Sequence, residues 1–197
     1  MFRRLFCIVF IVFIAIPVFA SENTGTVSGK VKVLRARRSA NVVVYLQDVP
    51  GTFKPSEKHS KMDQRNLIFI PHVLPVLVGT TVDFPNSDTV NHNVLSTSKT
   101  KKFNLGTYSK AMVKQVTFDK KGVVALLCNV HTEMSAYVVV LPNPYFARTD
   151  NDGRFTIANI PPGQYTLEAW HEDRRPYRQT VTIEAGKTTE ITIELSR

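Results

Sequence analysis

Four side chains in the sequence have the types and the spacing of a metal site. Cys128, His131 and Met134 form a Cys-x2-His-x2-Met triplet directly after an apolar run, and His92 lies well upstream of them. Cysteine thiolate and methionine thioether are soft ligands that suit copper, and imidazole binds copper in both oxidation states. One thiolate, two imidazoles and one thioether therefore predict a mononuclear type 1 copper site.

Zinc is the competing metal. Cys128, His92 and His131 also make a three-ligand set with an open fourth position, which is the arrangement of a catalytic zinc site. Zinc rarely takes methionine, so the presence of Met134 favours copper.

The first 20 residues have the pattern of a secretory signal peptide. Arg3 and Arg4 precede an apolar run that ends in small residues suited to a signal peptidase. The run is short for a transmembrane helix, so we expect a periplasmic or secreted protein with no stable membrane span after cleavage.

Cleavage also removes Cys7 and leaves Cys128 as the only cysteine. A lone thiol in an oxidising compartment is a liability unless a metal holds it, which supports the copper interpretation.

The mature chain is basic. The full chain has a formal net charge of +9, which falls to about +7 because Arg3 and Arg4 leave with the signal. The lysines gather in polar loops without an arginine-rich helix or an aromatic and basic stripe, so we expect no nucleic-acid binding. The positive excess favours an acidic partner or an anionic surface.

Short β-type runs separated by turn signals fill the mature chain and predict an all-β protein. In residues 26–34, Val27, Val31 and Val33 alternate onto one face, which Gly29 shares. We expect further strands at 41–46, 67–70, 76–78, 80–84, 93–96, 113–118, 123–127, 137–141, 154–157, 165–170, 179–183 and 189–195. The polar stretch 51–66 is expected to be a linker loop, and the lysine-rich stretch 99–108 an exposed loop.

Residues 67–142 resemble the cupredoxins, in particular the small bacterial plastocyanin and amicyanin branch. The matching residues are Phe69-x-Pro71, Val76-x2-Gly79-x2-Val82-x-Phe84-x-Asn86-x-Asp88, His92-Asn93-Val94, and Cys128-x2-His131-x2-Met134 with the amicyanin spacing. The resemblance implies a Greek-key β-sandwich that holds one copper ion.

The same resemblance assigns roles to the site residues. His92, Cys128 and His131 would form the trigonal plane, and Met134 the weak axial ligand. Asn93 would support the site from outside, with its backbone N–H toward the thiolate and its side chain tied to the Cys128 loop near Asn129. The edge of His131 would be the port through which electrons enter and leave.

A second resemblance is split between residues 21–50 and 143–197, which look like one carboxypeptidase-regulatory-like (transthyretin-like) β-sandwich. The first part carries Gly25-Thr26-Val27-Ser28-Gly29-Lys30-Val31, and the second carries Thr149-Asp150-x-Asp152-Gly153-x-Phe155 and Pro161-Pro162-Gly163-x-Tyr165. We infer that the cupredoxin domain is inserted into a loop of this sandwich, while two domains in tandem remain the alternative. Asp150 and Asp152 are expected to form an Asx-type turn, because the segment is too short for an EF-hand loop.

The sequence contains no Ser-His-Asp arrangement, phosphate loop or cofactor fingerprint, so we expect no enzyme. The favoured function is a one-electron carrier that serves a redox partner protein. Two alternatives stay open: a copper-binding or copper-delivery module, and a carbohydrate-binding or structural surface protein. The last would bind a glycan through the outer domain and requires Trp170, Tyr165 and Tyr177 to line an exposed face. His59 and His72 are expected to be surface or packing residues.

Overall fold

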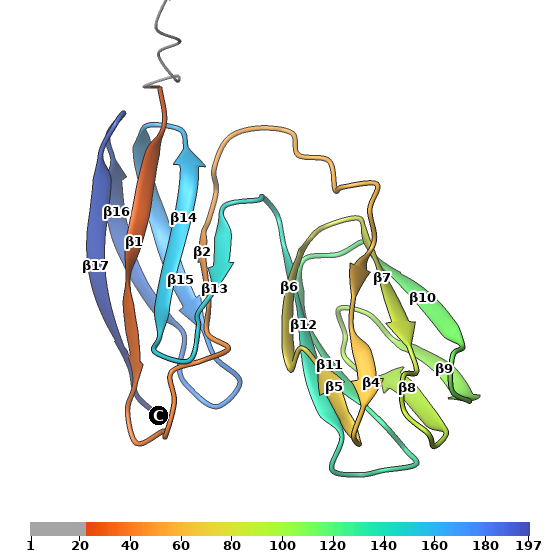
Figure 1. The fold of residues 1–197 in the computed structure, drawn as a ribbon. Helices are drawn as coiled ribbons and strands as arrows, with labels where there is room; N and C mark the ends of the chain where they lie inside the picture. The colour runs from red at the N-terminus through yellow and green to blue at the C-terminus, as the bar shows by residue number, and fades with distance from the viewer. Residues whose placement is uncertain (1–22) are drawn as a thin grey trace, which may run out of the picture.

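The computed structural model describes residues 23–197, and the signal peptide expected at 1–20 lies outside the described residues. Two β-sandwiches stand side by side and contain 17 strands (Figure 1). The predicted all-β class is therefore confirmed. Among residues 23–197, no helix has the length and apolar character that crossing a membrane requires.

The outer sandwich consists of two sheets formed by both ends of the described chain. One sheet has the order β14-β1-β17, with bounds Arg154–Ile160, Gly25–Val33 and Thr188–Leu195. The other has the order β13-β2-β15-β16, with bounds Phe146–Arg148, Val43–Leu46, Gly163–Trp170 and Tyr177–Ile183. The alternation predicted for the first strand is confirmed, because Val27, Val31 and Val33 are all buried in the core of this sandwich.

The inner sandwich is built from the strands between β2 and β13. Its five-stranded sheet has the order β6-β12-β11-β8-β9, with bounds Val73–Leu77, Ser135–Leu141, Gly122–Leu127, His92–Ser96 and Phe103–Tyr108. Facing it are the sheet β10-β7-β3, with bounds Val113–Phe118, Thr80–Pro85 and Ser60–Lys61, and the hairpin β4-β5, with bounds Asp63–Arg65 and Ile68–Ile70.

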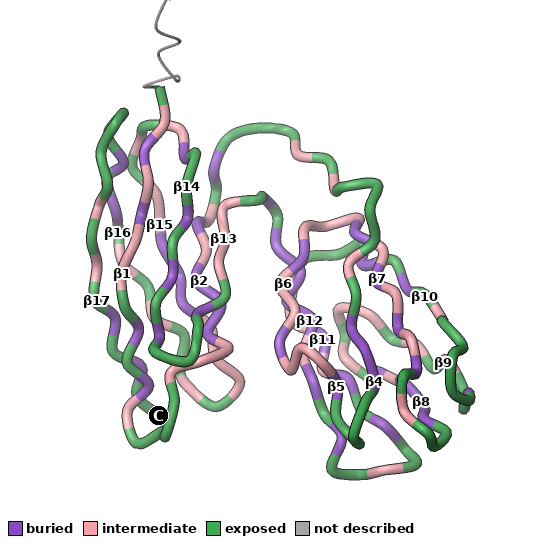
Figure 2. Tube along the Cα trace, viewed as in Figure 1, coloured by how far each residue is buried: buried purple, intermediate pink, exposed green. Residues whose placement is uncertain are grey.

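The chain leaves the outer sandwich after β2 and returns to it at β13. There β2 pairs antiparallel with both β13 and β15, so strands far apart in the sequence close one sheet. Each sandwich has a hydrophobic core of its own, and the buried residues lie along the facing sides of its sheets (Figure 2).

Two segments expected to be loops contain strands. In the expected linker 51–66, β3 pairs with β7 and β4 pairs with β5, so the end of this stretch belongs to the inner sandwich. In the expected loop 99–108, β9 pairs with β8. All three strands contain polar residues and lie at a sheet edge or in a two-stranded hairpin, where a short strand shows little apolar periodicity.

A small apolar cluster joins the two sandwiches. Its buried members are Val43, Val73, Val139 and Leu141, and Tyr45, Tyr137, Phe146 and Trp170 pack against them. Polar contacts add to this junction, since Nη1 of Arg148 donates to the carbonyl of Val73 at 3.0 Å. These contacts hold the two sandwiches together.

Candidate metal centre

The four predicted ligands lie at one end of the inner sandwich. Cys128 directly follows β11, and His131 and Met134 lie in the loop between β11 and β12. His92 is the first residue of β8, which runs antiparallel to β11 and therefore begins where β11 ends. The strand order thus brings residues from two loops to the same place.

Three of these side chains converge on one point. The ligand atoms of His92, Cys128 and His131 all lie within 4.8 Å of one another. The Nδ1 atoms of the two histidines face each other at 3.1 Å, with the ring planes inclined at 64°. Nitrogen and sulfur ligands bind a zinc-sized metal ion at about 2.0–2.3 Å, so two ligand atoms of one ion lie within about 4.4 Å of each other. The cluster is therefore within a few tenths of an ångström of that limit.

The ligand loop closes on itself through backbone hydrogen bonds. The N–H of Cys128 donates to the carbonyl of Met134 at 3.3 Å, and the N–H of Met134 donates to the carbonyl of His131 at 3.1 Å. Cys128, Met134 and His92 are buried, whereas His131 is partly exposed. The donor set therefore fits a soft metal ion, with Met134 buried beside the thiol and His131 facing solvent.

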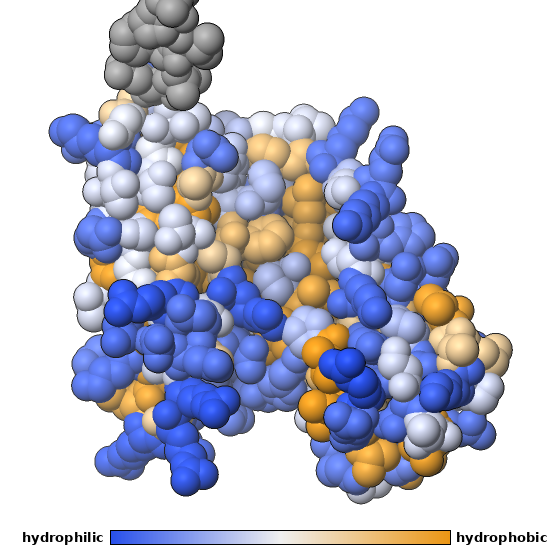
Figure 3. All heavy atoms as spheres, viewed as in Figure 1, coloured by the Kyte–Doolittle hydropathy of each residue, from blue (hydrophilic) through white to orange (hydrophobic). Residues whose placement is uncertain are grey.

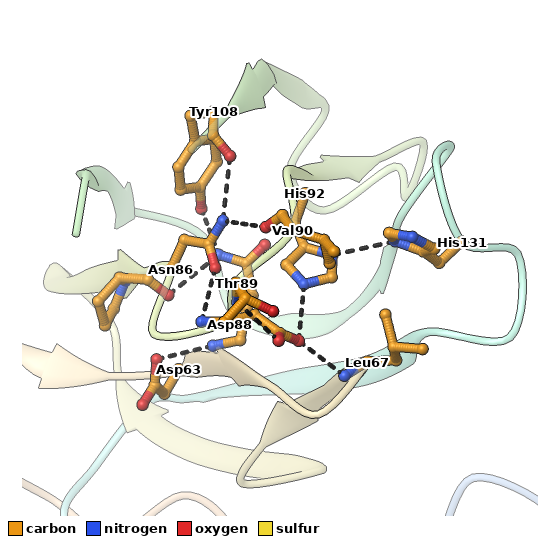
Figure 4. Close-up of polar contacts among 11 residues, drawn as sticks. Asp63, Leu67, Asn86, Asp88, Thr89, Val90, His92, Tyr108 and His131 are labelled. Atoms are coloured by element: carbon orange, nitrogen blue, oxygen red, sulfur yellow. Dashed lines mark hydrogen bonds and ion pairs between the residues drawn. The ribbon is translucent and has the colours of Figure 1, made fainter. Parts of the chain in front are cut away.

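A carboxylate supports the buried histidine from the side opposite His131 (Figure 4). Oδ2 of Asp88 lies 3.1 Å from Nε2 of His92 and accepts from the N–H of Leu67 at 2.9 Å. The pKa of Asp88 is lowered to about 2, first by the Leu67 N–H and then by His92 and the N–H of Thr89. An ionised Asp88 accepts a hydrogen bond from the protonated Nε2 of His92. This leaves Nδ1 of His92 without a proton and free to bind a metal.

A buried amide and a buried phenol fix the loop that carries Asp88. Nδ2 of Asn86 donates to the carbonyls of Val90 and Tyr108, and its Oδ1 accepts from the N–H of Asp88. The hydroxyl of Tyr108 donates to the carbonyl of Phe84 and accepts from Nε2 of Gln64, and burial raises the pKa of Tyr108 to about 12. This network holds the segment that leads into His92, from Asn86 to Val90, in one conformation.

Asn93 is placed differently from the arrangement that the cupredoxin resemblance implies. Its Nδ2 donates to Oδ1 of Asn104 on β9 at 2.8 Å, instead of reaching Asn129. Its Oδ1 is buried and has no hydrogen-bond partner among the described residues. The physical reason is the β8–β9 pairing, which sets Asn93 opposite Thr107 and brings Asn104 within reach.

Asp88, Asn86 and Gln64 support the site, and the sequence reasoning assigned no role to them. Asn86 and Asp88 belong to the Asn-x-Asp motif of the cupredoxin resemblance, and Asp88 lies four residues before His92. A carboxylate so close to a ligand histidine is a signal that could have identified Asp88. No local pattern marks Gln64, because it reaches Tyr108 from an edge strand.

The remaining predicted residues lie away from the centre. His59 lies near Asp83 on the surface, and His72 pairs with Glu172 at the junction of the sandwiches. Oδ1 of Asp150 accepts from the N–H groups of Asp152 and Arg154, which confirms the expected Asx-type turn.

The aromatic residues of the glycan hypothesis do not form one exposed face. Trp170 packs edge to face on Tyr137 at the junction, with ring centroids 5.5 Å apart. Tyr165 and Tyr177 are partly buried against the outer core.

Comparison with known protein families finds a match in the C-terminal part of the chain. Residues 134–196 match the Carboxypeptidase regulatory-like domain. The match covers β12 and the strands β13–β17, so its main part lies in the outer sandwich. A Rhamnogalacturonate lyase from Dickeya dadantii is 42% identical over 48 residues, which are 22% of this chain. The match spans only 8% of the length of that lyase.

Solved structures similar to this chain include several copper proteins. A purple cupredoxin from Nitrosopumilus maritimus shows 24% identity and a TM-score of 0.39, over 42% of this chain and 99% of that one. A reduced amicyanin variant shows 20% identity and a TM-score of 0.41, over 50% of this chain and 98% of that one. A Cu-containing nitrite reductase from Thermus scotoductus shows 24% identity and a TM-score of 0.42, over 49% of this chain and 26% of that one. The chain thus has cupredoxins among its structural neighbours and carries a carboxypeptidase regulatory-like domain.

Proposed function

We propose that this chain is an exported type 1 copper protein that carries single electrons. The observation that carries the proposal is the convergence of the ligand atoms of His92, Cys128 and His131 within 4.8 Å, with Met134 buried in the same core cluster as the cysteine. Copper bound there would alternate between Cu(I) and Cu(II) and so store one electron. Export is proposed from the signal pattern at residues 1–20.

The surrounding residues hold the ligands in place before any metal binds. Strands β8 and β11 fix the positions of His92 and Cys128, and backbone hydrogen bonds close the ligand loop between Cys128 and Met134. Asp88 fixes the orientation and the tautomer of His92. A site held this rigidly needs little rearrangement when its charge changes, which favours fast electron transfer.

The partly exposed His131 offers a route to solvent, and an apolar rim surrounds this end of the sandwich. The rim is formed by large hydrophobic side chains that remain exposed: Leu67 at 38%, Ile68 at 53%, Val90 at 41% and Val130 at 46%. Each lies in or next to one of three connections, β4–β5, β7–β8 and β11–β12, that meet at the metal end (Figure 1). An exposed apolar rim is a surface on which a partner can dock.

We propose a carrier and not an enzyme. Within residues 23–197, this is the one place where three or more His, Cys, Asp or Glu side chains could hold a metal ion. Oxidase chemistry would require further copper ions beside the first, each with its own ligands.

The two alternative functions receive less support from the contacts. A delivery module must pass its metal to another protein, but Cys128, His92 and Met134 are all buried. A glycan-binding face would need exposed aromatic rings, and Trp170 is occupied by its contact with Tyr137.

The proposal is tested by adding Cu(II) to the purified mature protein and recording visible and EPR spectra. We expect an intense thiolate-to-copper absorption band and the narrow copper hyperfine splitting of a type 1 site. Cys128→Ala should lose the band and remain folded. His59→Ala, which removes a histidine outside the cluster, should keep it.

A colourless protein with an ordinary Cu(II) spectrum would show that the four side chains do not bind one ion. A coloured protein that exchanges electrons slowly and holds Cu(I) tightly would favour metal delivery instead.

A further inference from the structure

Arginine side chains gather at one end of the outer sandwich. They come from three segments, namely the loop after β1, the loop between β15 and β16, and the residues after β17. We call this set the basic flank, and its members are Arg35, Arg37, Arg38, Arg174, Arg175 and Arg197.

The three segments form one continuous surface. Nη2 of Arg174 donates to the carbonyl of Leu34 at 3.2 Å, which ties the β15–β16 loop to the loop after β1. The N–H of Arg175 donates to the carbonyl of Ser196 at 3.3 Å, which ties the same loop to the chain after β17. A groove of about 530 Å³ runs between these segments and is lined by Leu34, Arg35, Arg174, Ser196 and Arg197.

The basic flank is fixed beside the ligand loop. Glu172, two residues before Arg174, lies 2.8 Å from Nε2 of His72. Nδ1 of the same histidine lies 3.2 Å from the carbonyl of Ser135, which directly follows Met134. A short chain of contacts therefore connects the arginine-bearing loop to the end of the ligand loop.

The basic flank and the metal end also point in the same direction. The loops that contain the arginines and the loop between β11 and β12 lie at the lower end of the molecule in Figure 1. On the face drawn in Figure 3, strongly hydrophilic residues cover the lower part of the outer sandwich, and hydrophobic residues border the neighbouring part of the inner one.

The charge of this surface is mainly positive. Arg35, Arg37 and Arg38 are exposed and have no acidic residue among their sequence neighbours in the loop. The nearby acidic residues are Asp152, which shares a groove with this loop, Asp173 and Glu172 in the β15–β16 loop, and Glu194 near the end of β17, which pairs with Lys32. The six arginines of the basic flank outnumber these carboxylates, so the surface keeps a positive excess.

We propose that the electron-transfer partner is an acidic protein that covers the apolar rim and the basic flank together. The apolar rim would supply the close contact beside His131, and the basic flank would attract and orient the acidic surface. One electron would leave through the His131 edge and reduce a one-electron acceptor of the partner, and no bond forms or breaks. This inference rests on the proposed function and assigns the outer sandwich a part in it.

The test compares two charge-reversal variants of equal net charge. Arg35→Glu/Arg37→Glu/Arg38→Glu alters the basic flank. The control Lys54→Glu/Lys120→Glu/Lys121→Glu alters exposed lysines at the opposite end, since 119–121 connect β10 to β11 away from the ligand loop. Each copper-loaded protein is reduced and mixed in a stopped-flow instrument with an acidic cytochrome c or with a basic one.

At low ionic strength, we expect the rate of electron transfer from the flank variant to the acidic cytochrome to fall by about tenfold or more. The reason is that electrostatic steering raises association rates by about 10-fold or more. The difference should disappear in high salt. The control should stay near the unaltered rate, and the basic cytochrome should not be slowed by either variant.

Equal slowing by both variants would show a simple effect of net charge and would overturn the proposal. A second result would also overturn the proposal: the unaltered protein binds vesicles of an anionic phospholipid, and the flank variant loses this binding while its electron-transfer rate is unchanged. The visible spectrum and reduction potential of each variant, recorded first, separate this failure from failure of the proposed function. A missing thiolate band in the unaltered protein contradicts the copper site itself, whereas a normal band with arginine-independent rates contradicts only the docking surface.

Discussion

The carboxylate of Asp88 lies 3.1 Å from Nε2 of His92, on the side of the imidazole that faces away from His131. It thus acts on the metal centre through a histidine without touching the metal position. Its own orientation is fixed by the N–H groups of Leu67 and Thr89. The metal centre therefore has a negatively charged support outside its four predicted ligands.

Asp88→Asn should raise the reduction potential of the copper site. An anionic partner makes the imidazole of His92 a stronger donor and so stabilises Cu(II), and the neutral amide removes that effect. Affinity for Cu(II) should fall by about 10- to 100-fold. Redox titration and a competitive chelator assay measure the two changes. An unchanged potential would show that Asp88 only shapes the loop.

The acid stability of the metal-free protein should depend on the same carboxylate. The pKa of Asp88 is lowered to about 2 in the folded chain, against about 3.9 in an unfolded one. A lowered pKa stabilises the fold above the unfolded value, and this contribution is lost as the pH falls through the folded value. Urea titrations between pH 5 and pH 2 should therefore show a steeper loss for the natural chain than for Asp88→Asn. Parallel curves would contradict the assignment.

Met134→Leu should keep the colour of the copper protein and raise its reduction potential. Leucine nearly preserves the buried volume, at a cost below about 1.5 kcal/mol, but lacks the thioether that stabilises Cu(II). Met134→Ala leaves a cavity and should cost about 2–5 kcal/mol of unfolding free energy. Redox titration and chemical denaturation separate the two roles. If Met134→Leu had no effect on the potential, the residue would be a packing residue alone.

Leu67→Asn should leave the protein as stable as before or more stable. Leu67 has a φ of 60° in the β4–β5 turn, where a left-handed backbone costs a bulky residue about 1–2 kcal/mol. Asparagine tolerates this conformation, and the 38% exposed leucine loses little burial. Ile68→Asn, in the neighbouring strand, is the control and should give no gain. A clear loss of stability in Leu67→Asn alone would show that its apolar contacts outweigh the strain.

Gly153→Ala should destabilise the outer sandwich and spare the metal centre. A Cβ there would lie 2.0 Å from the carbonyl oxygen of Val31, and the φ of Gly153 is +81°. The strain alone costs about 1–3 kcal/mol, and the clash adds to it. Gly186→Ala is the matched control, because Gly186 has a φ of +70° but nothing within 4 Å. Denaturation followed beside the copper absorption band measures both effects, and equal losses in the two variants would rule out the clash.

The residue types and local spacing determined much of the fold and the identity of the candidate ligands. Alternation placed Val27, Val31 and Val33 on the buried face of β1, and the apolar run before Cys128 is strand β11. The mixture of thiolate, imidazole and thioether follows from the sequence alone, because ligand chemistry belongs to the side chains themselves. The Asx-type turn at Asp150 is equally local.

The tertiary structure alone decided which distant residues meet. Strands β3, β4 and β9 carry polar residues, so their apolar periodicity is weak and only their partners define them. The turn of Asn93 toward Asn104 depends on the pairing of β8 with β9. The joining of arginines from three segments, and their position beside the ligand loop, depends on contacts such as that between His72 and Glu172. Such contacts are set by the packing of whole strands, which no short stretch of sequence specifies.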